Sequence, residues 1–336
     1  MIRFKPFAIR SSLLATVLLT GAVSARPGRT TARPAKSWTT DIGTFALLPT
    51  PNDSMTPTTL FGLSPDGDSS VGVTWEPGRP VNPKAYMYSY ITEDLARVYR
   101  AFGFPTVARA INDAGDVAGF WVDSTVVDNT EQHGFVFHEG QYYPIAFPGS
   151  NDNNAAGINN AGTIVGAYFT PERARHQYIY EDGVFTSFDL PDSFGACVTI
   201  THGINSSDAI VGAYRVARPH MPCGGPFHAY VRHADGTFSG FDATADATSS
   251  EAWGINDQGD IVGQYDTIDG KTHGFLLRGN GEPVITIDFP NWNGDTNLRG
   301  IDNSGRIMVG NINTRGDVPS FTFRLTLCGV HCDQAP

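Results

Sequence analysis

Apolar residues in this chain alternate with polar ones in short runs, a period of two that is typical of β-strands. In one stretch, four such runs follow each other at residues 157–158, 164–168, 176–180 and 185–190. Gly, Asn and Asp fill the intervals and argue against a helix, because Gly costs about 1 kcal/mol relative to Ala inside one. The pattern therefore predicts four antiparallel strands joined by tight turns, which we call strands A to D in chain order.

The turn between strands A and B has its own sequence signature. Asn159 at the first turn position can hydrogen-bond its own backbone, and Gly162 three residues later can adopt a positive φ without steric cost. These two residues predict a type I turn closed by a Gly bulge.

The stretch "GINNAGTIVGAY" at residues 157–168 is one of six near copies, which begin at residues 62, 110, 157, 203, 254 and 300. The third position of the copies is Ser64, Asn112, Asn159, Asn205, Asn256 and Asp302, at intervals of 48, 47, 46, 51 and 46 residues. A near-constant period of this size indicates a repeat architecture. Each copy is therefore expected to be part of one four-stranded unit.

The two ends of the repeat array complement each other. The sixth unit has a strand C at residues 320–325 but no strand D, whereas residues 44–51 precede the first strand A and resemble the strand D sequence at 186–193. Pairing the two would close a ring and remove the exposed sheet edges of an open array. The prediction is an all-β, six-bladed β-propeller of four-stranded blades over residues 38–327, closed by an N-terminal strand, with residues 328–336 as a tail. A β-solenoid, the alternative, normally uses shorter repeats and does not explain the complementary ends.

Residues 1–25 have the pattern of a signal peptide. Three basic residues precede the apolar stretch "LLATVLLTGAV", and Val23, Ser24 and Ala25 fit a cleavage site. The apolar stretch is too short for a membrane span, and the Pro- and Arg-containing residues 26–37 are expected to form a flexible linker. The sequence thus predicts a secreted or periplasmic protein, with a buried N-terminal helix as the alternative interpretation.

Removal of this leader would leave 20 Lys and Arg against 34 Asp and Glu, a net charge of −14. An acidic surface repels nucleic acid and anionic membranes, which are bound through basic side chains. We therefore exclude nucleic acid as a partner. A monomer is expected, with a glycan or a protein of unspecified identity as its ligand.

Four cysteines in an exported chain indicate two disulfides. Cys328 and Cys332 lie close together in the tail, which leaves Cys197 to pair with Cys223. In a propeller, Cys197 precedes a strand A and Cys223 precedes the strand C of the same blade, and the loops before both strands emerge on one face of the ring. Metal binding by Cys328, His331 and Cys332 is the alternative, but it lacks a fourth ligand. No metal or other cofactor is expected.

A second motif follows most copies of the first: "HGF" at His133 and His273, "HAY" at His228 and "HQY" at His176. Together the two motifs resemble the HAF family of extracellular repeats, which is named after the second one. The resemblance covers nearly all of the chain after the leader, although Asp208 replaces the turn Gly in the fourth unit. It implies an exported bacterial protein with a propeller fold, and it implies no particular activity.

Residues that recur in every unit are poor candidates for catalysis, because an active site needs unlike groups around one reacting centre. The four repeated histidines of the second motif are therefore predicted to be structural. We expect them to hydrogen-bond a neighbouring blade.

One position breaks the repeat. Just before the Gly of strand A (Ala110 in the second unit), the six units carry Phe61, Arg109, Ala156, His202, Trp253 and Arg299. Strand A is innermost in a propeller, so these side chains are expected near the central opening, where arginines suit a carboxylate and Trp offers a stacking face for a sugar. Packing between blades is the alternative interpretation.

Loops on the face where strand A begins are long and uneven, and they contain Trp75, Trp121 and Trp292. Aromatic residues on the loops of a rigid scaffold commonly serve recognition. Trp75 and Trp292 are therefore predicted to bind ligand together with the non-repeated position. The ionisable groups expected on this face are Glu76, Glu172, His220 and Glu251.

Two classes of function fit these observations. The first is a binding or interaction module that uses one face of the propeller. The second is a carbohydrate-active enzyme, a polysaccharide lyase or glycoside hydrolase, with Arg109, His202 and Arg299 at the channel mouth. We favour the binding module, because no acid/base pair stands out within a motif.

Overall fold

The computed structural model describes residues 36–48, 58–76, 79–89, 94–123, 125, 131–217, 223–313 and 321–328 of the 336-residue chain. The predicted signal peptide lies outside these residues, as do most of the linker and of the C-terminal tail. Within the described part, no helix has the length and apolar character needed to cross a membrane.

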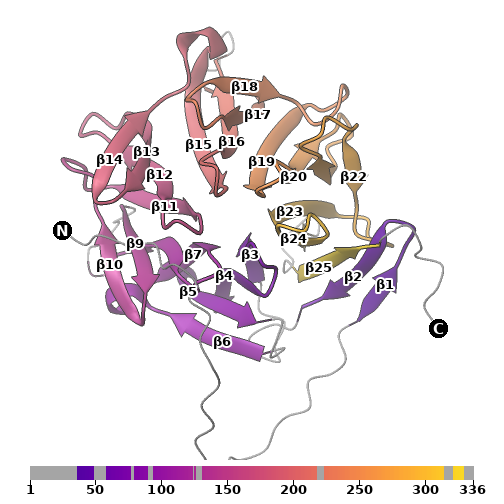
Figure 1. Cartoon of the computed structure of the whole chain (residues 1–336), viewed down its shortest axis with the longest axis horizontal. Coiled ribbons are helices and arrows are strands. Elements are labelled where there is room, and N and C mark those ends of the chain that lie inside the picture. Colours follow the sequence, from indigo (N-terminus) through magenta and orange to yellow (C-terminus); the bar gives the residue numbers. More distant parts are fainter. Residues whose placement is uncertain are drawn as a thin grey trace, which may run out of the picture.

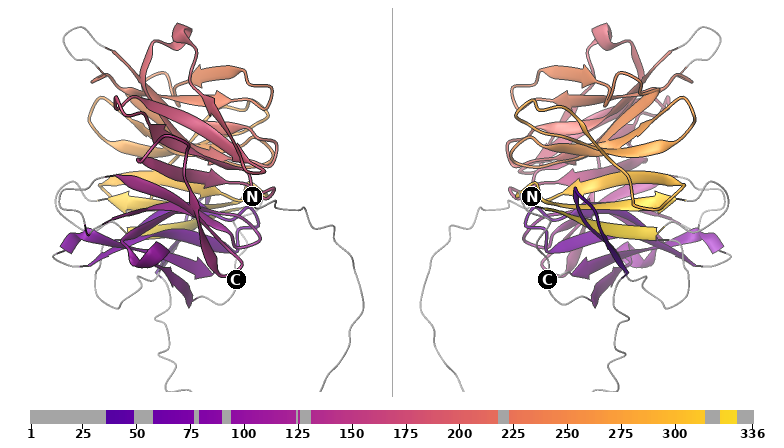
Figure 2. Two further views of the ribbon diagram at one scale, coloured as in Figure 1. Left: turned by 90° about the vertical axis from the view of Figure 1, so that its left-hand side faces the viewer. Right: turned by 90° about the vertical axis from the view of Figure 1, so that its right-hand side faces the viewer.

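Six antiparallel sheets stand as blades around a central axis, as Figure 1 shows face-on and Figure 2 edge-on. The innermost strand of every blade is strand A. The first blade contains β3 (Thr58–Leu63), β4 (Ser69–Glu76), β5 (Arg79–Ser89) and β6 (Asp94–Tyr99). The second contains β7 (Thr106–Ile111), β8 (Val117–Val122), β9 (Gln132–His138) and β10 (Gln141–Ile145). The predicted six-bladed propeller is confirmed.

The next three blades follow the same plan. The third contains β11 (Asn153–Ile158), β12 (Ile164–Phe169), β13 (Arg175–Glu181) and β14 (Val184–Phe188). The fourth contains β15 (Ala196–Ile204), β16 (Ile210–Val216), β17 (Phe227–Arg232) and β18 (Phe238–Phe241). The fifth contains β19 (Ser249–Ile255), β20 (Ile261–Asp266), β21 (Thr272–Leu277) and β22 (Ile285–Ile287). Short 3-10 turns, η1 (Ala101–Gly103) and η2 (Asp192–Phe194), precede the second and fourth blades.

The sixth blade joins the two ends of the described chain. Its strands are β23 (Asp295–Ile301), β24 (Ile307–Asn313), β25 (Phe321–Leu327), β2 (Gly43–Leu47) and β1 (Ser37–Thr39). Phe45 in β2 pairs with Leu325 in β25, so the N-terminal strand supplies the missing strand D as predicted. The sequence did not predict β1, because its three residues match no strand of the repeat; they pair with β2 as a fifth strand.

The two repeated motifs meet inside five of the six blades. The aromatic residue at the third position of the strand C motif is buried in the core, and Tyr178 has no exposed surface. It packs on the Gly of strand B, since a Cβ added to Gly166 would lie 2.7 Å from the Tyr178 hydroxyl. Equivalent close pairs are Gly119–Phe135, Gly212–Tyr230, Gly263–Phe275 and Gly310–Phe323. The repeated Gly therefore makes room for the repeated aromatic ring.

The repeated Asn links the turns between strands A and B of five successive blades. Gly162 has the predicted positive φ of 85°, and Asn159 Oδ1 accepts hydrogen bonds from the backbone N–H groups of Ala161 and Thr163 at 3.0 Å. Asn159 Nδ2 then donates to the Asn205 carbonyl of the next blade at 3.1 Å. The same inter-blade bond is made by Asn112, Asn205 and Asn256. We call these four side chains the turn ring.

Three of the four repeated histidines pair within their own blade, so the prediction that they bond a neighbouring blade is wrong. Nδ1 of His176 lies 2.8 Å from Asp189, a residue that follows strand D of the same blade. Corresponding distances are 3.0 Å for His228–Asp242 and 2.9 Å for His273–Asp288. Strands C and D are adjacent and antiparallel, which brings the start of one beside the end of the other. In the second blade the same position is Ala146, and His133 instead stacks on Trp121 at 4.3 Å.

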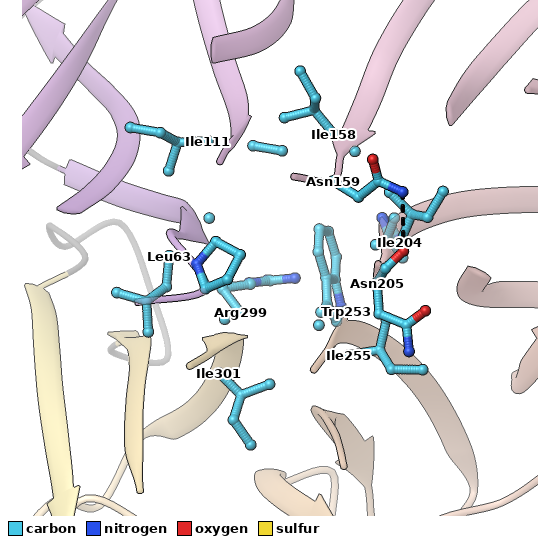
Figure 3. A pocket seen from close by; sticks show the side chains of 18 of the residues that line it. Leu63, Ile111, Ile158, Asn159, Ile204, Asn205, Trp253, Ile255, Arg299 and Ile301 are labelled. Atoms are coloured by element: carbon cyan, nitrogen blue, oxygen red, sulfur yellow. Dashed lines mark hydrogen bonds between the residues drawn. The ribbon is translucent and has the colours of Figure 1, made fainter. Parts of the chain in front are cut away.

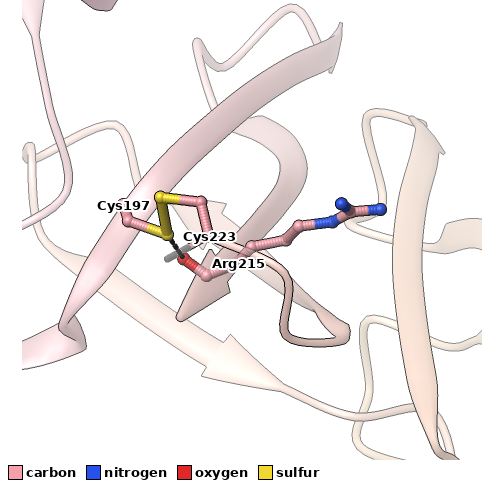
Figure 4. The surroundings of a disulfide bond; sticks show 3 residues. All are labelled: Cys197, Arg215 and Cys223. Atoms are coloured by element: carbon pink, nitrogen blue, oxygen red, sulfur yellow. Dashed lines mark hydrogen bonds between the residues drawn. A yellow bond between two sulfur atoms is a disulfide. The ribbon is translucent and has the colours of Figure 1, made fainter. Parts of the chain in front are cut away.

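A disulfide joins Cys197 at the start of β15 to Cys223 in the loop before β17 (Figure 4). The Cα atoms are 5.5 Å apart, and the Cys197 sulfur lies 3.4 Å from the Arg215 carbonyl oxygen. This predicted pairing is confirmed, and a disulfide is the mark of an oxidising compartment. Cys332 lies outside the described residues, so its pairing with Cys328 stays a prediction.

Candidate ligand-binding site in the central channel

Each of the six innermost strands carries a β-bulge at the same repeat position. In β11 the register with β12 shifts between Ala155 and Gly157, which leaves Ala156 as the extra residue. A bulge re-aims the side chain of the extra residue. The extra residues of the six strands are Phe61, Arg109, Ala156, His202, Trp253 and Arg299. We call these six residues the bulge ring; they are the non-repeated position of the sequence.

A cavity opens along the axis from the bulge ring to the turns between strands A and B (Figure 3). Its volume is about 70 Å³, and the bulge ring forms its floor. Its wall consists of the aliphatic residue two positions further along each strand: Leu63, Ile111, Ile158, Ile204, Ile255 and Ile301. Turn residues such as Ser206, Asp257 and Asn303 form the rim.

This cavity opens on the face opposite to the one that the sequence indicated. Its lining residues follow the bulge ring along strand A, whereas the long loops lie at the start of that strand. Trp292 packs into the core of the sixth blade and donates its indole N–H to the Asn313 carbonyl at 3.2 Å. Trp292 is not among the described residues that line the cavity, and the Trp75 side chain is outside the described part. The structure brings the six side chains together, and the cavity that they line extends away from the face with the long loops.

Trp253 lies between two other members of the bulge ring. The Arg299 guanidinium carbon is 3.5 Å from the Trp253 ring centroid, and the His202 ring stacks on Trp253 at 3.6 Å with planes 18° apart. Two groups this close to one centroid must occupy opposite faces of the indole. Trp253 therefore offers no free face for a sugar ring, and it holds the guanidinium by a cation–π contact.

Arg109 completes the cationic part of the floor. Its guanidinium carbon lies 4.5 Å from the Phe61 ring centroid and 5.3 Å from that of Trp253. One of its terminal nitrogens is 3.3 Å from Nδ1 of His202. Because a guanidinium only donates, His202 Nδ1 is the acceptor and Nε2 carries the proton of the neutral ring.

Burial shapes the protonation of this cluster. The His202 side chain is 4% exposed, and loss of solvation lowers the pKa of this imidazole from 6.5 to about 4, so the ring is neutral at physiological pH. Desolvation also lowers the pKa of Arg109 to about 10 and that of Arg299 to about 9, which leaves both protonated at neutral pH.

Glu251 is the carboxylate beside the cluster. Burial raises the pKa of Glu251, but His202 and Arg299 outweigh it and the net shift is downward. Its Oε1 accepts from Gln264 Nε2 at 3.1 Å. The other oxygen is 3.9 Å from His202 Nε2, too far for a direct hydrogen bond, so that contact is electrostatic.

Several buried donors of the bulge ring have no hydrogen-bond partner among the described residues. They are Nε and Nη1 of Arg299, Nε1 of Trp253 and Nε2 of His202. Buried polar groups in native proteins nearly always have partners, because an unpaired one costs about 1–3 kcal/mol. Since all the unpaired groups of the bulge ring are donors, the missing partner is a hydrogen-bond acceptor.

The other ionisable candidates do not join this cluster. Glu172 lies exposed in the loop between β12 and β13, and His220 falls outside the described residues, as does the Glu76 side chain. Among the residues with described positions, no group of three or more His, Cys, Asp or Glu is placed to hold a metal ion. Sequence reasoning missed the aliphatic wall, although an Ile two residues after the bulge position in five of the six repeats was a visible signal.

No family model and no curated protein matches the chain. Among solved structures, it is similar to a mutant of AofleA from Arthrobotrys oligospora, with TM-score 0.51 and 11% identity over 81% of this chain and 84% of that one. A protein of unknown function from Dyadobacter fermentans gives TM-score 0.53 and 10% identity over 84% and 98%. A putative TolB from Agrobacterium tumefaciens gives TM-score 0.50 and 13% identity over 82% and 91%. At these identities the likeness shows the fold alone: the chain is a six-bladed β-propeller with a cationic floor in its central cavity.

Proposed function

We propose that this protein is a secreted or periplasmic binding module of the HAF repeat type that takes a small ligand into its central cavity. One observation carries the proposal. Six strands with the same bulge present six positions to the channel, and their side chains differ and leave buried donors unpaired. If these residues only packed the blades together, the repeat would have no reason to abandon its regular sequence there.

Burial supports binding over catalysis. A general acid or base must reach the proton that it transfers. The His202 ring is covered by Trp253 on one face and is 4% exposed, which suits a rigid support better than a proton shuttle. The contact between His202 and Glu251, beside two arginines, is the observation that favours the alternative, a polysaccharide lyase or glycoside hydrolase.

A binding panel run alongside a turnover assay separates the two functions. Purified protein lacking residues 1–25 is tested for thermal stabilisation by small molecules and glycans, and for cleavage of uronic acid polysaccharides. His202→Ala is compared with His233→Ala, which changes an exposed histidine outside the cavity. We expect at least one ligand that stabilises the protein with no turnover. Cleavage that His202→Ala abolishes and His233→Ala retains would replace the binding module by the enzyme.

A further inference from the structure

The floor of the cavity has one positive charge in excess. Arg109 and Arg299 are opposed by the single carboxylate of Glu251. Arg175 interacts electrostatically with Arg109, but its own charge is opposed by Asp152. His202 contributes no charge at neutral pH. One monoanion would therefore neutralise the floor, whereas a dianion would leave a buried negative charge.

The unpaired donors match the acceptors of a carboxylate. Arg299 has two donors, Nε and Nη1, without partners among the described residues. These nitrogens flank Cδ and donate in different directions, so each can bond one oxygen of an anion, and a hydrogen bond from a charged donor to a carboxylate oxygen is among the stronger ones.

The wall of the cavity is partly apolar. Leu63 and five Ile residues line the space between floor and rim (Figure 3), although all of them except Ile255 are mostly buried in the cores between blades. Strongly hydrated anions such as phosphate would lose their water there without compensation. An alkyl chain gains roughly 0.8 kcal/mol for each CH₂ group that it buries.

Acidic residues at the rim are engaged in bonds between turns. Asp257 accepts from Ser206 N–H and from Asn303 Nδ2, both at 2.8 Å. Asp113 accepts from Asp66 N–H at 2.8 Å and from Asn160 Nδ2 at 2.6 Å. These carboxylates repel an anion that enters the cavity, but they do not lie at the floor, where the anion would bind.

From these features we infer that the cavity binds a small aliphatic monocarboxylate, with its carboxylate on Arg299 and Arg109 and its alkyl chain between the six aliphatic side chains. This inference rests on the proposed function and names its ligand class. It replaces the sugar expected from Trp253, whose two faces are occupied.

Hexanoate and hexanamide are a matched pair of probes, because they share the chain and differ in the charge of the head. Calorimetric titration of the purified protein should give binding of hexanoate at least roughly ten-fold tighter than that of hexanamide, the value of one charge-assisted hydrogen bond. Equal affinities would overturn the inference, and so would a failure of hexanoate to bind at millimolar concentration. This comparison uses the unaltered protein and does not depend on how a variant folds.

Variants then locate the site. Arg299→Gln should weaken hexanoate binding by at least roughly ten-fold, whereas Arg306→Gln, which changes an exposed arginine outside the cavity, should leave it unchanged. Hexanoate binding that both variants retain would place the ligand elsewhere and overturn the inference. A neutral compound from the panel that binds in the cavity while hexanoate does not would overturn the carboxylate but leave the binding module in place.

Discussion

The turn ring and the bulge ring, three residues apart in the repeat, behave in opposite ways. The turn ring repeats Asn in four units, and each of these side chains is buried and bonded to the next blade. All six positions of the bulge ring share a bulged backbone, but only Arg occurs twice among their side chains. The buried donors of this ring have no partners in the described structure. The first ring is explained by the fold alone, and the second is not.

This difference teaches how to separate structure from function within a repeat protein. A residue that satisfies all its hydrogen bonds within the fold contributes to stability, and its recurrence reflects a recurring geometry. A buried charge without an opposite charge reduces stability, so it persists where something other than the fold requires it.

The largest effect is expected from the turn ring. Asn159→Ala removes two bonds within a turn and two to the next blade, leaving buried backbone groups unpaired. We expect the free energy of unfolding to fall by about 2–4 kcal/mol, measured by denaturant unfolding. Asn160→Ala, at an exposed neighbouring position, should cost about 1 kcal/mol or less. Equal losses would mean that the turn ring has no special role.

A pH titration tests the burial of His202. The pKa of this imidazole is about 4 in the folded protein and 6.5 when it is solvated, so the unfolded chain binds the extra proton first as pH falls. Stability should therefore decrease between pH 6.5 and 4, by up to about 3 kcal/mol from this group. His202→Gln should show a shallower decline over that window than the unaltered protein, whereas His233→Gln should not. Parallel curves for all three proteins would contradict a buried neutral His202.

Removal of a floor arginine should stabilise the empty protein. Arg109 is buried beside Arg175 and has no carboxylate among the groups that shift its pKa. We expect Arg109→Met to raise the free energy of unfolding by about 1–2 kcal/mol while hexanoate binding weakens. Arg306→Met serves as the exposed control and should change stability by less than about 0.5 kcal/mol. A clear loss of stability in Arg109→Met would favour a packing role for the bulge ring.

The smallest effect concerns the rim. Asp257→Asn removes a negative charge that an anion passes on its way into the cavity. Association of hexanoate, followed by stopped flow at low ionic strength, should accelerate by roughly two-fold, and the difference should vanish at high salt. An unchanged rate at low salt would show that anions do not enter past this residue.

The fold was largely predictable from the sequence, because a six-fold repeat and complementary ends constrain the topology. Gly162 and Asn159 specified their turn, and the pairing of residues near Phe45 with strand C of the last unit followed from the missing strand D. Strand β1 was not predictable, because Trp38 and its neighbours belong to no repeat and are held by local pairing and by the contact with Phe289 at 5.1 Å.

The site was predictable only in part. The departure from the repeat identified the six residues of the bulge ring, since variation within a repeat is visible without coordinates. The face toward which these side chains point depends on the bulge. A bulge is a backbone feature that the residue types in these six strands do not predict. The unequal loop lengths drew attention to the opposite face, and the stacking of Arg299 and His202 on Trp253 emerges from the ring geometry alone.

The central claim is that the bulge ring exists for a ligand, and a crystal structure with bound hexanoate tests it most directly. We predict electron density for a carboxylate within hydrogen-bonding distance of Arg299 or Arg109, with the alkyl chain directed toward the rim between Ile111 and Ile255. An empty cavity at saturating hexanoate, or the ligand seated among the loops near Trp121 on the other face, would contradict it.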